Sequence, residues 1–203
     1  MLSYETRFTI TKTLYVSSTQ DYVLALANFY SITPLVPVLR ILNWDIPHAN
    51  NIAKNNSITY LMDVEFTKRM TICCDAAWNL ESSIYNVLYI NGAGSTIEAS
   101  FKSRDEDKWI VLSNDTALAA RNITLKGFNT AIENMGGECM LLFVNFDKNK
   151  MDYLVERDWG AAILNTGLLT CINCSFTNNF AKNGGAIFNQ GMLTNSKLYL
   201  FRQ

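Results

Sequence analysis

The sequence predicts an all-β fold in which the second part of the chain is a parallel β-helix. From about residue 85, short β-branched or apolar runs alternate with Asn, Gly, Ser and Asp, and no long helical periodicity is present. A six-residue motif then recurs three times, at intervals of 31 and 24 residues. A recurrence of this length is typical of stacked repeats, and the absence of leucine-rich or helical repeat patterns favours the β-helix.

The chain divides into two parts at this change of character. Residues 1–84 form an N-terminal segment or cap of uncertain structure, in which RFTITKTLYVSS predicts one or two strands and residues 22–30 predict a short helix. The apolar stretch 22–42 contains Pro34 and Pro37, so we expect a buried segment rather than a membrane-spanning helix. No clear signal peptide is present. Residues 85–203 carry the β-helix repeats.

The recurring motif is A-I-x-N-x-G, which begins at Ala131, Ala162 and Ala186, and a second motif, F-x-x-N, follows the first two copies. In stacked coils, equivalent residues lie directly above one another at the strand spacing of about 4.8 Å. We therefore expect an inward isoleucine stack, a phenylalanine stack, a hydrogen-bonded asparagine ladder and glycines in turn conformations. The repeat positions are Ile132, Asn134, Gly136, Phe146, Asn149, Ile163, Asn165, Gly167, Phe176, Asn179, Gly184, Gly185, Ile187, Asn189 and Gly191.

The last repeats also resemble a known family. GGAI at residues 184–187, preceded by FTNN at residues 176–179, resembles the GGA(I/L/V) and FxxN repeats of polymorphic outer-membrane proteins. It is even more similar to the repeats of large adhesin-like surface proteins of methanogenic archaea, in the pectate-lyase-like superfamily. INGAGSTIEAS (90–100) and NITLKGF (122–128) resemble the opening coils of such domains. The resemblance covers about residues 85–194.

This resemblance implies a right-handed solenoid, as the rule for parallel crossovers also does, at the cell surface or outside the cell. It implies a non-enzymatic adhesive or recognition role, with surface glycans or cell-surface proteins of a host or partner cell as partners. Family members continue for many coils, whereas this pattern stops after Thr194. We therefore expect a fragment whose C-terminal edge meets the remaining coils of a longer protein, or another chain. A gene remnant is the other interpretation of the interrupted coil.

The alternative function is that of a carbohydrate-active β-helix enzyme, a polysaccharide lyase or a glycoside hydrolase. Such an enzyme needs clustered carboxylates on one face. The candidates are Asp105, Glu106, Asp107, Asp147, Asp152, Glu156 and Asp158. No acidic motif recurs at the coil spacing, and charged loop residues are usually solvated. We therefore expect no enzyme activity, no catalytic residue and no cofactor.

Aromatic loop residues are the candidates for sugar binding, because sugar rings stack on aromatic faces. Tyr153 and Trp159 are the two binding candidates, and Trp109 and Phe180 are further aromatic residues that could be exposed on loops. For each of these residues, packing in the core or against a turn is the more frequent role.

Charge and cysteine content exclude further classes of function. The formal net charge is −1 and the cationic residues are scattered, so nucleic acid is not an expected partner. Cys171 and Cys174 form a CxxC motif, but no second pair of ligands matches it and His48 is the one histidine, so we expect no metal site. The five cysteines are an odd number for a closed disulfide framework, and we expect the CxxC pair to pack as small apolar residues beside Cys139.

Overall fold

The computed structural model describes residues 8–29, 58–74, 77–80, 86–100, 108–150 and 159–201. Within these ranges the chain is mainly β-structure with one helix, and every strand pair is parallel. The predicted predominance of parallel β-structure is therefore confirmed. Residues 30–57, which hold most of the apolar stretch with its two prolines, lie outside the described ranges.

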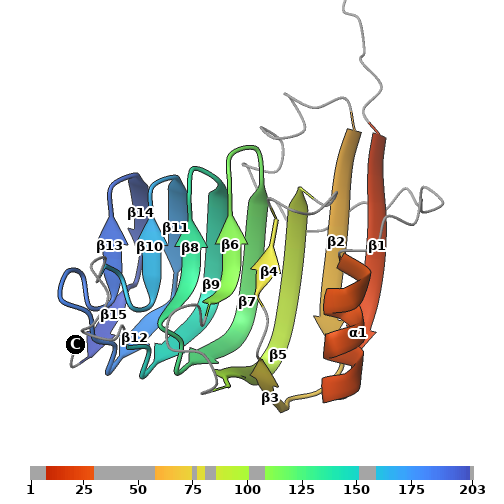
Figure 1. Cartoon of the computed structure of the whole chain (residues 1–203), viewed down its shortest axis with the longest axis horizontal. Helices are drawn as coiled ribbons and strands as arrows, with labels where there is room; N and C mark the ends of the chain where they lie inside the picture. The colour runs from red at the N-terminus through yellow and green to blue at the C-terminus, as the bar shows by residue number, and fades with distance from the viewer. Residues whose placement is uncertain are drawn as a thin grey trace, which may run out of the picture.

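The strands form two sheets, one in front of the other in Figure 1. The path of the larger sheet is β1 (Phe8–Val16), β2 (Ile58–Phe66), β5 (Val87–Ala99), β7 (Ala117–Lys126), β9 (Glu138–Asp147), β11 (Leu168–Ile172) and β14 (Met192–Ser196). Three short strands join it: β3 (Thr71–Cys74), β12 (Ser175–Thr177) and β15 (Tyr199–Phe201). The smaller sheet contains β4 (Trp78–Asn79), β6 (Lys108–Leu112), β8 (Thr130–Asn134), β10 (Ile163–Asn165) and β13 (Ile187–Asn189).

From β6 onward the chain alternates between the two sheets. Each strand of the smaller sheet is followed by one long strand or two short strands of the larger sheet. We call each such combination a unit: β6–β7, β8–β9, β10–β12 and β13–β15. Successive units lie beside one another in chain order (Figure 1). Equivalent side chains of successive units therefore share columns, and alternate columns point into the space between the sheets.

Helix α1 (Thr19–Phe29) occupies the N-terminal end of this stack. Figure 1 shows it in front of β1 and β2, on the side of the smaller sheet. Its buried Tyr22 hydroxyl accepts hydrogen bonds from the indole N–H groups of Trp78 (2.7 Å) and Trp109 (3.0 Å). A short helix near residues 22–30 was predicted, and it is present. In the described residues, no helix has the length and apolarity needed to cross a membrane.

The isoleucine and asparagine positions of the repeat form columns in the smaller sheet. Ile163 lies in register with Ile132 on one side and Ile187 on the other, and Asn165 pairs likewise with Asn134 and Asn189. The amide of Asn134 donates to the Oδ1 of Asn165 at 2.7 Å, and the amide of Asn165 donates to the Oδ1 of Asn189 at 2.6 Å. The asparagine ladder therefore runs in one direction along the stack.

The F-x-x-N motif turns the chain at the end of the larger sheet. Phe146 and Phe176 are register partners whose rings stack at 4.7 Å with 7° between their planes. Two residues after each of them, Lys148 and Asn178 adopt positive φ angles of 55°. The buried Asn149 then accepts from the amide N–H of Phe128 (3.0 Å), and its own side chain donates to the Asn179 Oδ1 (2.9 Å).

The expectation for the motif glycines needs a correction. Gly136 has a positive φ of 98°, as predicted, but no such φ distinguishes Gly167 or Gly191. The turn in the first copy is one residue longer, so Gly167 lies against Gly137 rather than Gly136. A Cβ atom on Gly167 or Gly191 would collide with the backbone of the preceding unit. Close backbone approach, rather than turn conformation, therefore requires glycine at these two positions.

The glycine pair before the last motif copy has two distinct roles. Gly184 has a φ of 64°, and Gly160 in the preceding unit has a φ of 67°. A Cβ on either residue would also press on the carbonyl group of the following isoleucine strand. Gly185 is half-buried, and Ala161 takes its place in the preceding copy. The replacement of this second glycine by alanine is therefore compatible with the same turn.

Three cysteines belong to the interior of the stack. Cys139, Cys171 and Cys174 are buried free thiols, whereas Cys73 is exposed. Burial raises the pKa of the Cys139 thiol, and a hydrogen bond to Cys174, followed by burial, raises the pKa of Cys171. The Cys174 Sγ contacts the Leu141 carbonyl oxygen at 3.5 Å. Within the described residues no cluster of His, Cys, Asp or Glu could hold a metal ion.

Candidate functional site

A column of left-handed residues follows one corner of the larger sheet. Each unit has one residue of positive φ at this corner: Asn122 (52°), Phe143 (55°), Asn173 (52°) and Lys197 (56°). The strand pairing on either side keeps these four positions in register. Asparagine adopts this conformation more readily than most residues, whereas a bulky aromatic residue there is an outlier.

Phe143 is therefore the exception in the corner column. Its side chain is 53 % exposed, although it lies in the middle of strand β9. Phe146 in the same strand is fully buried and stacks on Phe176. A strained conformation that presents a large apolar ring to solvent does not contribute to the core. Such outliers concentrate at functional sites, where the surrounding structure holds them.

A bulge in the neighbouring strand β5 forms one wall beside this corner. Asn91 pairs with Arg121 and Ser95 pairs with Ile123, so three residues of β5 lie opposite Asn122 alone. Two of these three, Ala93 and Gly94, have positive φ angles of 49° and 78°. Bulges of this kind redirect a strand at a sheet edge or beside a site.

The loop after strand β2 places Arg69 above this wall. The buried Ser95 hydroxyl accepts a hydrogen bond from the Met70 amide at 3.0 Å and donates to the Lys68 carbonyl at 3.3 Å. The Thr96 amide donates to the Met70 carbonyl at 2.8 Å. Both residues that flank Arg69 are thus tied to β5. A Cβ on Gly94 would lie 3.8 Å from the Arg69 Cδ, so the arginine stem passes over this glycine.

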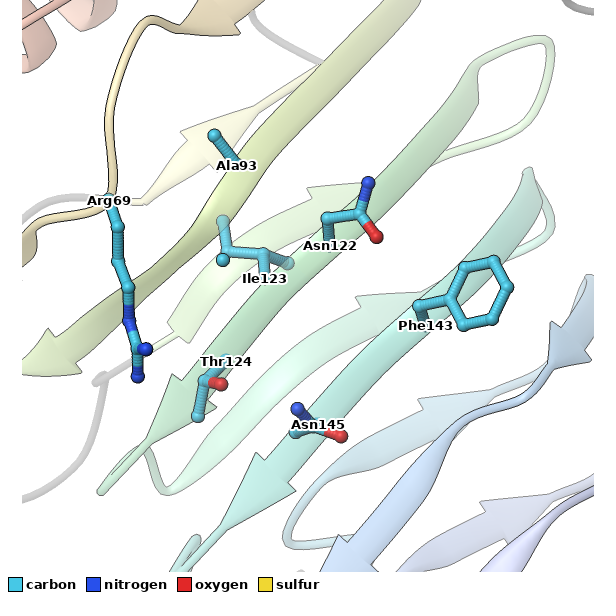
Figure 2. A pocket seen from close by; sticks show the side chains of 8 residues that line it. Arg69, Ala93, Asn122, Ile123, Thr124, Phe143 and Asn145 are labelled. Carbon is cyan, nitrogen blue, oxygen red and sulfur yellow. The ribbon is translucent and has the colours of Figure 1, made fainter.

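These parts enclose an open groove of about 390 Å³, shown in Figure 2. Arg69 and Ala93 border one side and the ring of Phe143 borders the other. Three polar side chains lie between or beside them: Asn122, Thr124 and Asn145. The volume falls within the range of small-molecule sites, about 300–1,000 Å³. The lining is thus an aromatic ring, amides, a hydroxyl and one guanidinium group.

The electrostatic character of the groove is set by Arg69. Among the described residues that line the groove, Arg69 is the one charged side chain. No carboxylate in the described part of the chain pairs with it. The Asn145 Oδ1 is engaged by the Ser175 hydroxyl at 2.6 Å, which orients that amide. The groove therefore offers one cation that no described carboxylate neutralises, beside neutral hydrogen-bonding groups.

The aromatic residues proposed from the sequence lie elsewhere. Trp159 is half-buried and stacks on Phe188, with ring centroids 5.0 Å apart. Trp109 is fully buried, which confirms the core packing expected as its more frequent role. Phe180 is half-buried and pairs with Lys150 through an isolated β-bridge. None of these three lines the groove. Tyr153 lies outside the described residues.

Of the seven candidate carboxylates, Asp147 alone falls in the described ranges. It is half-buried on β9, where its register partners are Lys126 and Thr177. Lys126 donates to the Glu98 carboxylate at 2.8 Å, and this hydrogen bond, with the charges of Glu98 and Asp147, raises the pKa of Lys126. Asp147 therefore belongs to a line of alternating surface charges. The other six candidates are Asp105, Glu106, Asp107, Asp152, Glu156 and Asp158.

The groove residues were not found from the sequence, although one signal for them was present. Three residues before Phe146 stands Phe143, and three residues before Phe176 stands Asn173. The same offset before Leu125, the register partner of Phe146, gives Asn122. An aromatic residue thus stands at a corner position that holds asparagine in the unit before it and in the unit after it. Arg69 carries no such signal, because its place depends on the pairing of β2 with β5.

Comparison with known proteins does not assign the site. No protein-family model matches this chain, and neither a curated protein nor a solved structure matches it.

Proposed function

We propose that this chain is a non-enzymatic recognition scaffold of an adhesin-like cell-surface protein, built as a right-handed parallel β-helix. In this proposal each unit is one coil, and the two sheets are two faces of the solenoid. The register of isoleucines, asparagines and phenylalanines in successive units supports this arrangement. The rule for parallel crossovers supports the hand.

The asparagine ladder also supports a further coil as a partner at the C-terminal edge. In each step the amide of one asparagine donates to the Oδ1 of the next. Asn189 accepts from Asn165, and its own amide is turned to the Gly191 carbonyl at 3.0 Å. This exposed amide is the donor that another coil of the same repeat would engage. The remaining coils of a longer protein, or another chain, would supply that coil.

The observation that carries the recognition role is the exposed groove beside Phe143. The interior columns follow the repeat, whereas the groove departs from it at a solvent-facing position. An aromatic face with amide and hydroxyl groups nearby suits a saccharide, because sugars combine apolar ring faces with hydroxyl groups. Surface glycans are therefore the ligands that this proposal favours.

A glycan array with the purified chain tests the proposal, with soluble sugar release measured in the same wells. We expect retention of the protein on a subset of glycans without sugar release. Release of sugars would overturn the non-enzymatic assignment. A protein that folds, as judged by cooperative unfolding, and binds no glycan would overturn the saccharide-recognition role.

A further inference from the structure

We propose that the groove binds a saccharide that carries a carboxylate, with Phe143 as the platform for the sugar ring and Arg69 as the partner of the carboxylate. This inference rests on the proposed glycan-recognition function and specifies its site and ligand class.

The charge of the groove selects the ligand class. Arg69 is the one charged residue in the described lining, and no described carboxylate neutralises it. A guanidinium group presents its N–H donors in a planar fork that matches a carboxylate with two parallel hydrogen bonds. Because no acidic side chain of the described lining opposes the bound anion, a carboxylated sugar fits the groove better than a cationic one.

The anchoring of the Arg69 loop favours a prepared site over an incidental surface arginine. The buried Ser95 hydroxyl accepts from the Met70 amide and donates to the Lys68 carbonyl, so hydrogen bonds fix the backbone on both sides of Arg69. The stem of Arg69 also lies over Gly94, with its Cδ 3.8 Å from the position that a Cβ atom would take there. Holding a cation in place before binding reduces the entropy lost when a ligand is captured.

Phe143 supplies the apolar surface on the opposite side of the groove (Figure 2). Its left-handed backbone places the ring at the corner rather than in the sheet interior, and half of its surface is exposed. Asn122 and Asn145 lie between the ring and the arginine, within the same groove. A sugar ring stacked on Phe143 therefore has amide partners for its hydroxyl groups and a cation for its carboxylate.

The test is a binding titration of the full chain with an oligosaccharide that contains a uronic acid and with its methyl ester. A sialylated oligosaccharide and its methyl ester form a second pair, because both sugars offer the same carboxylate chemistry. We expect the acid of at least one pair to bind about tenfold or more tightly than its ester, since hydrogen bonds to charged groups are worth this much. The pair in which the acid binds more tightly than the ester identifies whether the groove takes a uronic acid or a sialic acid.

Variants then assign the difference to the two named residues. Arg69→Gln should abolish the preference for the acid over the ester, while Lys148→Gln, which removes an exposed cation outside the groove, should preserve it. Phe143→Asn should weaken binding of both acid and ester about tenfold, and Phe143→Tyr should retain it. Unfolding curves of each variant exclude loss of fold as the cause.

The outcomes separate this inference from the function on which it rests. Equal binding of acid and ester, or an unchanged preference for the acid in Arg69→Gln, would overturn the inference. Glycan binding would then be assigned to another surface of the chain. Absence of binding to any glycan, or sugar release, would overturn the proposed function itself. Unchanged affinity in Phe143→Asn would overturn the role of the ring.

Discussion

Two phenylalanines of strand β9, three positions apart, occupy opposite situations. Phe146 is fully buried, lies in register with Phe176 and stacks on its ring. Phe143 is half-exposed, adopts a left-handed backbone and lies in register with the left-handed Asn122 and Asn173. The first obeys the repeat and the second interrupts it. The comparison distinguishes a residue that the packing of the stack requires, Phe146, from one that the stack accommodates without needing it, Phe143.

The columns of the interior show what the stack requires. In the isoleucine and asparagine columns of the smaller sheet, identical residues satisfy one another: isoleucine lies in register with isoleucine, and asparagine donates to asparagine. The side chains of the corner column are exposed or half-buried, and Asn122 and Phe143 line the groove. A residue that departs from the repeat is therefore expected to lower the free energy of unfolding strongly inside the stack and only slightly at the corner. At the corner such a residue can contribute to ligand binding instead.

Replacing each phenylalanine by alanine should show the largest difference in stability between the two positions. Phe146→Ala should lower the free energy of unfolding by about 3–5 kcal/mol, because it leaves a cavity beside the Phe176 ring. Phe143→Ala should lower it by about 1–2 kcal/mol, because half of that ring is already in water. Denaturant unfolding measures both. Equal losses would show that the corner ring is a core residue.

The parallel pairing and the register of the repeats were predictable from the sequence, because interior positions carry the same residue types in successive copies of the motif. The motif keeps the same residue type at equivalent positions of successive units, so A-I-x-N-x-G predicted the register that Ile132, Ile163 and Ile187 adopt. The reason for Gly167 was not predictable, since the extra residue in the preceding turn moves its contact to Gly137. One extra residue in a turn does not change the alternating pattern of the strands, so the sequence pattern does not reveal it.

The groove was less predictable because its residues come from separate units. Asn122, Phe143 and Asn145 share a surface through register, but Arg69 comes from a loop positioned by hydrogen bonds to Ser95. The spacing of these residues in the sequence does not indicate that they form a common site. The sequence instead drew attention to tryptophans, and Trp109 proved to be packed between elements of the core.

A matched pair of glycines tests the next strongest requirement of the stack. Gly167→Ala should destabilise the protein by about 3 kcal/mol, because its Cβ would strike the backbone of the preceding unit. Gly127→Ala should cost about 1–2 kcal/mol, since its φ is 76° but no atom lies within 4 Å of the added Cβ. Thermal and denaturant unfolding compare the two variants. A larger loss at Gly127 would contradict the close-approach explanation.

The asparagine ladder should show a gradient from its middle to its exposed end. Asn165→Ala should cost about 2–3 kcal/mol, because the buried amide connects Asn134, Asn189 and two carbonyl groups. Asn189→Ala should cost less than about 1 kcal/mol, because its exposed groups regain hydrogen bonds from water. Unfolding free energies of the two single variants give the gradient, and equal values would argue against a cooperative ladder.

The smallest effect is expected where the corner column is made regular. Phe143→Asn removes the strain of a bulky left-handed residue, worth about 1–2 kcal/mol. It also removes the contacts of a half-buried ring, worth about 2 kcal/mol for roughly 100 Å² of apolar surface. The two terms nearly cancel, so the free energy of unfolding should change by less than about 1 kcal/mol.

The reverse exchange in the next unit supplies the control for this balance. Asn173→Phe introduces the same ring at the equivalent corner, where φ is 52° and the residue does not line the groove. It should destabilise the protein by about 1–2 kcal/mol, because the strain is added without a prepared surface. If Phe143→Asn instead cost 3 kcal/mol or more, the ring would be held for packing. An unchanged stability combined with lost binding would mean that the corner carries its strained ring for the ligand.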